Sequence, residues 1–387
     1  MRCPLICLAI LTVLAGVGRA SSIPSIYWSE SGGIARANID GGGAVALTPG
    51  FVIGGLALDR ARDQLFFTDI VPSVPIGPSG IVNRGTADGA GVAPILRQLP
   101  APLALALDRN AGQVIWSDAE LHSISIAGYD GAHSKTILEP EPSIANINGL
   151  AFDPWERKLY FSYINPLVDN LRPGGIARMN LDGSDHENVV SGLVSPQGLA
   201  VDHVRGFVYW ADPEFGKGLI GRAGLDGSDP MKWTGGLGSP QGVAVDPYTN
   251  QIYWTDSATG KIQTGTPFVP AIDLVTDRDQ PNAIGLLIHS GLDGDTNDDG
   301  QVDLFDLNDV RNHFGRTPGP GPGDADLDGD VDIQDLNAVR NNYGSRFTAP
   351  AESNGVPEPS SALLAAAGIL AVGVLARKRK SPTLVRR

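Results

Sequence analysis

The chain has 387 residues and a formal net charge of −14 at pH 7. This negative net charge disfavours nucleic acid and anionic membranes as partners, because they are also negatively charged. The 49 glycines and 29 prolines predict many turns, and the length allows a substantial buried core. Both cysteines, Cys3 and Cys7, lie within the first 20 residues. Disulfides, zinc–thiolate sites and cysteine nucleophiles are therefore excluded from the rest of the chain.

Residues 1–20 have the pattern of a secretory signal peptide. Arg2 supplies a short positive start, residues 5–17 are apolar, and Gly18 and Ala20 are small residues at positions −3 and −1 from the expected cleavage site. We therefore expect an exported protein whose mature chain has no cysteine.

Residues 22–290 contain six copies of a tetrad in which two large apolar residues precede a small residue and, in most copies, an acid. Successive copies are separated by 39, 49, 45, 49 and 44 residues. The copies are Tyr27-Trp28-Ser29-Glu30, Phe66-Phe67-Thr68-Asp69, Ile115-Trp116-Ser117-Asp118, Tyr160-Phe161-Ser162-Tyr163, Tyr209-Trp210-Ala211-Asp212 and Tyr253-Trp254-Thr255-Asp256. A period in the forties without a long helical pattern predicts the blades of a propeller.

Other features recur around each tetrad. An apolar run precedes five tetrads and predicts an inner strand that is buried on both faces. These runs end at Asp59, Asp108, Asp153, Asp202 and Asp246, and Asp-Gly dipeptides recur at Asp40-Gly41, Asp88-Gly89, Asp130-Gly131, Asp182-Gly183 and Asp226-Gly227. The dipeptides predict type I′ hairpin turns, which need positive φ at both central residues. Each repeat therefore predicts a four-stranded blade.

The two ends of the repeat region predict how the ring closes. The tetrad at Tyr27 has no apolar strand before it, whereas the segment 281–288 after the last tetrad has the missing pattern. We expect this segment to supply the inner strand of the first blade, which leaves no open sheet edge. The predicted fold is an all-β six-bladed β-propeller followed by a small α-helical, calcium-binding C-terminal domain.

The tetrads, the Pro-x-Gly-apolar-Asp strands and the Leu-Asp-Gly-Ser turns together resemble the low-density-lipoprotein-receptor class B, or YWTD, repeat. The resemblance implies a six-bladed propeller in which the tetrad aspartate bonds between neighbouring blades. That structural role would fall to Asp69, Asp118, Asp212 and Asp256, whereas Glu30 and Tyr163 depart from the pattern.

Residues 293–344 predict a separate calcium module. Two segments that begin 29 residues apart, at Asp295 and Asp324, each fit an EF-hand-type loop with ligands at positions 1, 3, 5, 7, 9 and 12. The first offers Asp295, Asn297, Asp299, the Gln301 carbonyl, Asp303 and Asp306, and the second offers Asp324, Asp326, Asp328, the Asp330 carbonyl, Asp332 and Asp335. Gly300 and Gly329 stand at the sharp turn. Hard oxygen ligands favour Ca²⁺, so we expect two calcium ions.

One helix is predicted after each loop. Apolar stripes run through Leu304, Leu307, Val310 and Phe314 and through Ile333, Leu336, Val339 and Tyr343, and Gly315 and Gly344 end the helices. The module resembles a type I dockerin, which implies a cohesin-like partner, often within polysaccharide-degrading assemblies. The family's recognition positions commonly carry small hydroxyl residues, whereas Leu304-Phe305 and Ile333-Gln334 stand here. The alternative is an intramolecular role, in which the module packs against the propeller or stiffens the path to the C-terminal signal.

The C-terminal end follows a linker at 345–355. Val356-Pro357-Glu358-Pro359 precedes the uncharged stretch 360–376, a basic cluster at 377–380 and a basic tail at 381–387. The stretch is at the short limit for a single-pass anchor. The order of features in 356–380 resembles the bacterial PEP-CTERM sorting signal. This resemblance implies an exosortase as a partner during export, cleavage near the motif, and contact with the membrane only in transit or through the tail.

No catalytic constellation stands out in the sequence. The histidines, at 122, 133, 186, 203, 289 and 313, fall on different repeats or in the module, and we interpret them as ordinary surface residues. Acids in predicted loops, such as Glu139, Glu141 and Glu214, have no feature that selects them. We therefore favour a monomeric, extracellular or surface-attached binding or scaffold protein with a cell-surface or exopolysaccharide partner. The alternative is a carbohydrate-active or lactonase-like hydrolase with its active site in the propeller channel.

Overall fold

The computed structural model describes residues 24–70, 80–166, 174–213, 217–266, 271–288, 292–297, 299–315, 323–325 and 330–347. The predicted signal peptide, the sorting signal, residues 348–355, Glu214, His289, Asp326, Asp328 and Gly329 lie outside these ranges. Within them, no helix has both the length and the apolar character needed to cross a membrane.

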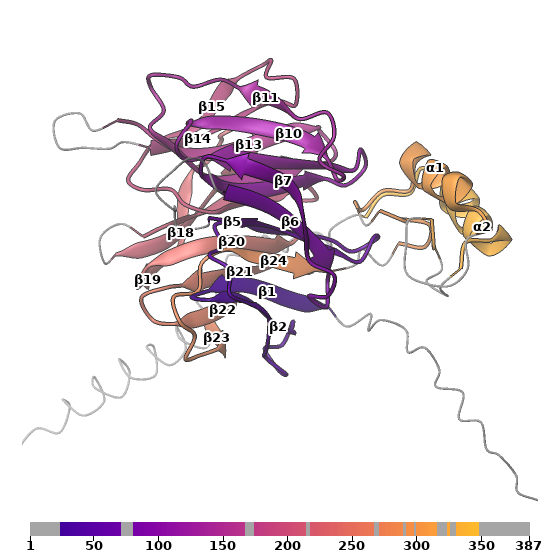
Figure 1. The fold of residues 1–387 in the computed structure, drawn as a ribbon, viewed down its shortest axis with the longest axis horizontal. Helices are drawn as coiled ribbons and strands as arrows, with labels where there is room; N and C mark the ends of the chain where they lie inside the picture. Colours follow the sequence, from indigo (N-terminus) through magenta and orange to yellow (C-terminus); the bar gives the residue numbers. More distant parts are fainter. Residues whose placement is uncertain are drawn as a thin grey trace, which may run out of the picture. The chain divides into compact units, whose positions relative to one another are not determined.

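Six four-stranded antiparallel sheets form the propeller that the repeat predicts (Figure 1). Blade one is β24 (Ile284–Leu287), β1 (Ser25–Glu30), β2 (Gly33–Asn38) and β3 (Val45–Pro49); blade two is β4 (Leu56–Asp59), β5 (Gln64–Asp69), β6 (Gly80–Thr86) and β7 (Ala93–Leu99); blade three is β8 (Pro102–Asp108), β9 (Gln113–Asp118), β10 (Ser123–Gly128) and β11 (Lys135–Leu138). Blade four is β12 (Asn146–Asp153), β13 (Lys158–Ile164), β14 (Gly174–Asn180) and β15 (Glu187–Leu193); blade five is β16 (Leu199–Asp202), β17 (Phe207–Asp212), β18 (Gly218–Gly224) and β19 (Met231–Leu237); blade six is β20 (Pro240–Asp246), β21 (Gln251–Asp256), β22 (Lys261–Gly265) and β23 (Ile272–Val275).

The predicted closure of the ring is confirmed. β24 pairs antiparallel with β1, with Leu287 opposite Ser25 and Ile284 opposite Trp28. In Figure 1 the orange β24 lies directly beside the indigo β1. The two ends of the repeat region therefore share one sheet, and the pairing removes the edge that β1 would otherwise expose.

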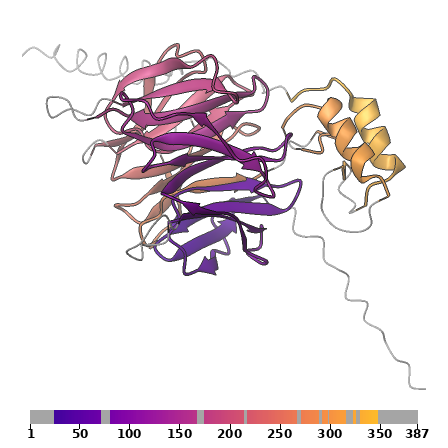
Figure 2. The ribbon, with the colours of Figure 1, turned by 45° about the horizontal axis from the view of Figure 1, so that its top comes forward.

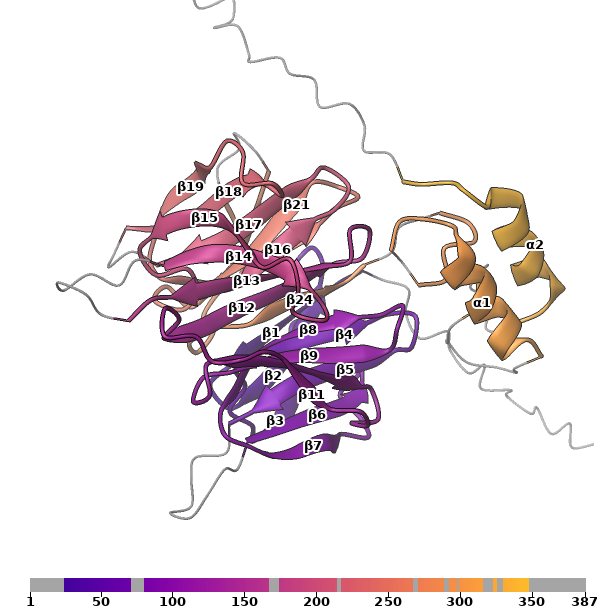
Figure 3. The same ribbon diagram turned by 90° about the horizontal axis from the view of Figure 1, so that it is seen from above.

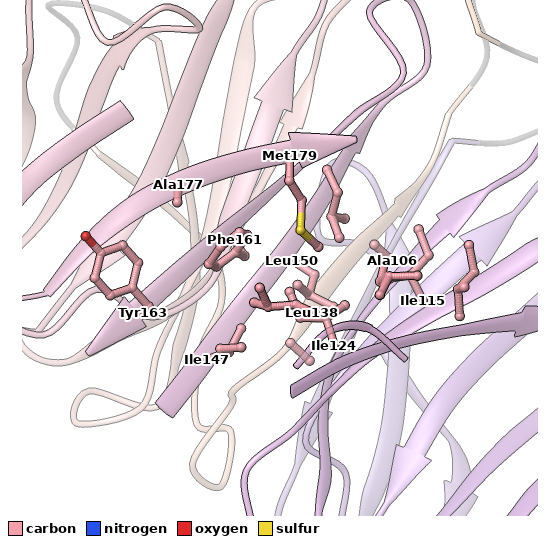
Figure 4. Packing of buried hydrophobic residues seen from close by; sticks show 14 of the residues in the cluster. Ala106, Ile115, Ile124, Leu138, Ile147, Leu150, Phe161, Tyr163, Ala177 and Met179 are labelled. Atoms are coloured by element: carbon pink, nitrogen blue, oxygen red, sulfur yellow. The ribbon is translucent and has the colours of Figure 1, made fainter. Parts of the chain in front are cut away.

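A hydrophobic core lies between every pair of neighbouring blades, and the tetrad strand contributes to the cores on both of its faces. Tyr27 packs toward blade two, whereas Trp28 packs toward blade six, because successive side chains of a strand point to opposite faces. Phe161 from β13 and Met179 from β14 meet Ile124 of blade three in the same way (Figure 4). The tetrad aromatics thus fill the space between sheets.

The small hydroxyl residue at the third tetrad position connects adjacent blades. Thr68 Oγ1 accepts a hydrogen bond from the Gly55 N–H at 2.8 Å and donates to the Leu103 carbonyl of blade three at 2.9 Å. The same pair of bonds, one within the blade and one to the next, is made by Ser117 with Ala104 and Ile147 and by Thr255 with Gly242 and Asn282. Each such hydroxyl joins two inner strands around the channel.

The Asp-Gly turns are not the predicted type I′ turns. Gly41 has a φ of 86°, but Asp40 does not adopt a positive φ, and the Gly41 N–H bonds back to the Asn38 carbonyl at 2.8 Å. The Asp40 carboxylate accepts the Gly42 N–H at 2.9 Å, which stabilises a different, longer turn. A Cβ at Gly41 would lie 2.3 Å from the Leu274 carbonyl of blade six. Glycine is therefore needed both for the turn and for contact between blades.

Two helices, α1 (Leu304–His313) and α2 (Ile333–Asn342), pack side by side in the C-terminal segment (Figures 2 and 3). Residues 292–347 are called the helical module below. Asp303 and Asp332 cap the helices as N-cap residues, each in a capping box with the Asp three positions later.

The apolar stripes predicted for these helices are buried only in part. Val310 and Val339 are fully buried, together with Val302 and Val331 from the loops. The ends of the stripes are 54–57% exposed, at Leu304, Phe314, Ile333 and Tyr343. The valines of the loops fill the small core, so the ends of two short helices have no opposing surface.

We predict that Thr68→Val lowers the free energy of unfolding by about 2 kcal/mol, because it leaves a buried N–H and a buried carbonyl without their partner. Chemical denaturation of the full-length protein measures this change. The matched control is Thr136→Val on the exposed outer strand β11, where a change below about 0.5 kcal/mol is expected. Equal effects at the two positions would contradict the role of the bridging hydroxyl.

Candidate functional site

Turns that follow the inner strands place a set of side chains at one end of the channel. The buried Asp108 accepts the Ala111 N–H at 3.1 Å and forms a 2.6 Å ion pair with Arg157 of blade four. Asp153 likewise accepts the Trp155 N–H at 2.9 Å. The buried Asp202 and Asp246 accept the Arg205 and Tyr248 N–H groups, both at 2.9 Å. These four carboxylates fix the turns that carry Asn110, Trp155, His203 and Tyr248, the four residues called the channel mouth below.

The channel contains a cavity of about 230 Å³ whose lining residues are mostly aliphatic. Its lining comes from the inner strands, with consecutive residues of each strand contributing, among them Leu58, Leu107, Val201, Val245 and Leu286. The titratable residues among the described lining are Arg109, His203, Tyr248 and Asp299. Arg109 directly precedes Asn110, His203 and Tyr248 belong to the channel mouth, and Asp299 belongs to the helical module.

His203 differs from the surface histidine that we expected from the sequence. Its ring centroid lies 4.8 Å from that of Trp155, and burial lowers its pKa to about 4. His203 is therefore neutral at physiological pH and packs as part of the mouth. Glu141 pairs with His186 at 3.4 Å, away from the channel lining. Within the described residues, the acids and histidines considered from the sequence do not converge on one site.

The first predicted calcium loop adopts a closed conformation around its own side chains. Asp295 accepts the N–H groups of Asp299 and Gly300, at 3.1 and 2.8 Å. Asn297 Oδ1 accepts the Asp299 N–H at 2.9 Å, and Asp306 accepts the Thr296 N–H at 2.8 Å. The residues at positions 1, 3, 5 and 12 of the loop are all buried.

The second loop shows the same pattern where the structure describes it. Asp335 accepts the N–H groups of Ala325 and Asp332, at 2.5 and 2.7 Å. Carboxylate oxygens of Asp330, Asp332 and Asp335 lie within 4.8 Å of one another. Asp330 was expected to bind calcium through its carbonyl, and its carboxylate also lies in this cluster.

The chemistry of these groups fits a hard divalent cation. Every predicted ligand is an oxygen donor, as Ca²⁺ prefers. Burial raises the pKa of Asp306 to about 7 and also raises the pKa of Asp299. A bound cation would stabilise the ionised carboxylates that burial disfavours. The predicted ligands in the described part of the loops are therefore suited to holding calcium.

The opposite end of the channel has a different chemistry. A smaller cavity of about 110 Å³ is lined there by glycines, by aliphatic residues and by four carboxamide residues, Asn148, Gln197, Gln241 and Asn282. The described lining contains no charged residue. Gln241 Nε2 donates to Ser239 Oγ at 2.9 Å, and Asn148 Nδ2 donates to the Pro196 carbonyl at 3.0 Å. These four residues form what is called the amide end below.

The tetrad aspartates bond to the segments that connect one blade to the next. Asp256 accepts the Gly238 and Ser239 N–H groups at 2.7 and 3.0 Å, just before β20 begins. Asp69, Asp118 and Asp212 make the equivalent bonds to Val52, Ala101 and Val194. Glu30 instead bonds the Arg278 side chain, with Nε at 2.8 Å.

Sequence reasoning missed two sets of residues. The bridging hydroxyls were quoted in the tetrads, but their role was not assigned. Asn110, Trp155 and Tyr248 each stand two positions after an inner-strand aspartate, where the repeat becomes irregular. The different residue types at this position were the available signal of a functional role. Residues that only maintain the blade structure recur from one repeat to the next.

Comparisons with known proteins support the fold. No protein-family model matches the chain. Vitellogenin receptor Yl of Drosophila melanogaster is 31% identical over 205 residues, or 51% of this chain and 9% of the receptor. Protein cueball of Drosophila erecta is 30% identical over 110 residues, or 28% of this chain and 16% of that protein. The chain thus spans only a small part of these relatives.

A solved structure covers most of the propeller. A chain in the crystal structure of a nidogen/laminin complex matches with a TM-score of 0.57 and 21% identity, covering 68% of this chain and 98% of that chain. A gluconolactonase from Xanthomonas campestris matches with a TM-score of 0.49 and 18% identity, over 60% and 78% of the two chains. The ring described here is a six-bladed β-propeller similar to the YWTD propellers of low-density-lipoprotein receptors.

We predict that Asp256→Ala lowers the free energy of unfolding by about 2 kcal/mol and preserves ligand binding by the folded protein. The substitution leaves backbone N–H groups at the start of blade six unsatisfied. Thermal unfolding measures the effect, and Asp279→Ala, at an exposed site, is the control. A stable variant that has lost binding would point to a direct functional role for the tetrad.

Calcium titration of the full-length protein by calorimetry should show about two ions per chain. Asp306→Ala and Asp335→Ala should each remove one binding event, because each deletes the last ligand position of one loop. A wild-type protein that binds no calcium under these conditions would refute the assignment of both loops.

Proposed function

We propose that this protein is an extracellular binding and scaffold protein with calcium-stabilised loops, and that its propeller binds a neutral glycan at the amide end. The observation that carries the proposal is the group of four carboxamide side chains, from four different blades, that line one cavity at the amide end. The relatives named as a receptor and the nidogen-like fold are consistent with an extracellular binding role.

The amide end suits a ligand that is polar and uncharged. Carboxamides can both donate to and accept from hydroxyl groups, and the cavity that they line contains no charged residue among those described. A neutral exopolysaccharide of the cell surface has this chemistry. The acidic chain would bind such a polymer without the electrostatic repulsion expected from an anionic one.

The other parts of the chain would place the propeller outside the cell. We propose that residues 1–20 direct export and that 356–380 act as a sorting signal for an exosortase. Leu304, Phe305 and Ile333 on the helical module are 41–57% exposed and would present an apolar surface to a cohesin-like partner.

We predict that the full-length protein binds neutral polysaccharide fragments saturably and releases them unchanged. Gln241→Ala should weaken binding about 3- to 10-fold, as expected for the loss of one hydrogen bond. Calorimetry measures affinity, and chromatography of the recovered glycan detects any cleavage. Gln113→Ala, at the end of the ring that carries the channel mouth, is the matched control.

Two results would argue against this function. Cleavage of the glycan, or of a lactone tested in parallel, would favour the hydrolase alternative. Equal binding by the wild type and Gln241→Ala would remove the amide end as the ligand site.

A further inference from the structure

We propose that Asn110 of blade three is a positioning residue for the first calcium loop, so that a cation in this loop holds the helical module against the channel mouth. The inference rests on the calcium role proposed for the loops. It adds a propeller residue to the shell around the metal and couples the two parts of the chain.

Asn110 touches two predicted ligands of the first loop. Its Nδ2 donates to Asp299 Oδ2 at 3.2 Å, and its Oδ1 accepts from Asn297 Nδ2 at 2.8 Å. The second bond orients the Asn297 carboxamide so that its nitrogen faces Asn110. The Oδ1 atom of Asn297 then accepts the Asp299 N–H within the loop. One propeller side chain therefore fixes the orientation of the ligands at positions 3 and 5.

The other residues of the channel mouth complete the contact. Trp155 Nε1 donates to the Asp299 carbonyl at 2.9 Å, and the Arg346 guanidinium lies 4.1 Å from the centroid of the Trp155 ring. Phe347 packs edge-on against Tyr248, with ring centroids 4.9 Å apart. The contact thus combines polar bonds to the loop with aromatic contacts to the end of the module.

The ring itself holds Asn110 in place. The Asp108 carboxylate accepts the Ala111 N–H and pairs with Arg157 of the next blade, which fixes the turn on both sides of Asn110. Partners of metal ligands that are fixed in this way orient the ligands and raise metal affinity. A rigid Asn110 would therefore pre-organise the first loop for the cation.

Coupling of this kind works in both directions. If docking on the mouth strengthens cation binding in the first loop, the cation must strengthen docking by the same factor. Asp299 also lines the channel cavity, so docking covers one end of it. Removal of calcium would therefore weaken the docking of the helical module on the channel mouth.

The test uses the full-length protein with Asn110→Ala and CaCl₂ alone as the probe. We expect calorimetry to show about tenfold weaker affinity at one site and an unchanged second site, because the contacts of Asn110 are with the first loop. Asn38→Ala, an exposed asparagine on blade one, is the matched control and should bind as the wild type does.

The fluorescence of Trp155 gives a second, independent readout of docking. Calcium should change the tryptophan emission of the wild type, and Trp155→Phe should abolish most of this change because the Trp155 indole contacts the loop. In Asn110→Ala, the same change should require about tenfold more calcium.

Each outcome separates this inference from the proposed function. Two sites with wild-type affinity and an unaltered fluorescence titration in Asn110→Ala would overturn the coupling and leave the calcium loops intact. A wild-type protein without calcium binding would overturn both. Loss of affinity at both sites together would show general damage to the module and would also contradict the specific role of Asn110.

Discussion

The pairing of β24 with β1 is the interaction on which the rest of the structure depends. It closes the ring, and it also delivers the chain to the channel mouth. The inner strands run from the amide end toward their terminal aspartates, and Leu287 occupies the register position that Asp59 holds in blade two. Asp295 follows only eight residues later, so the strand that closes the propeller also limits how far the first calcium loop can move from the mouth.

The bonds between blades explain how an irregular sequence keeps a regular ring. The tetrad aromatics fill the cores, the hydroxyls join neighbouring inner strands, and the aspartates hold the connecting segments. Ala211 lacks the hydroxyl at the third position of its tetrad, but there the Gly198 N–H bonds directly to the Gln241 carbonyl of blade six at 2.9 Å. The architecture therefore rests on many similar contacts, which frees the residues at the two ends of the channel for other roles.

Much of the fold could be predicted because it repeats. Six tetrads gave the number of blades, and the absence of an apolar strand before Tyr27 identified the closing strand. The turn type was wrong because the prediction considered only the φ preference of Asp-Gly, whereas the Asp40 carboxylate accepts a local N–H and stabilises another turn. One of the two partners of Thr68, the Leu103 carbonyl, belongs to another blade, so this contact depends on distances that sequence spacing does not give.

The candidate sites were predictable to different degrees. The ligand pattern of the calcium loops is local, so spacing alone indicated residues such as Asp295 and Asp306. The contact between the channel mouth and the helical module joins Asn110 and Asp299, which are 189 positions apart. No local sequence pattern predicts that contact. The carboxamides of the amide end come from four blades. The ring brings them together, so local sequence spacing does not predict this group either.

Hydrogen–deuterium exchange of the full-length protein, with calcium and then with a chelator, tests the central claim most directly. The account predicts that chelation raises exchange at residues 295–301 and, together with them, at the turns 108–112 and 153–157 of the channel mouth, while the tetrad strands stay protected. Faster exchange confined to the calcium loop, with the mouth turns unchanged, would contradict the coupling between the module and the propeller.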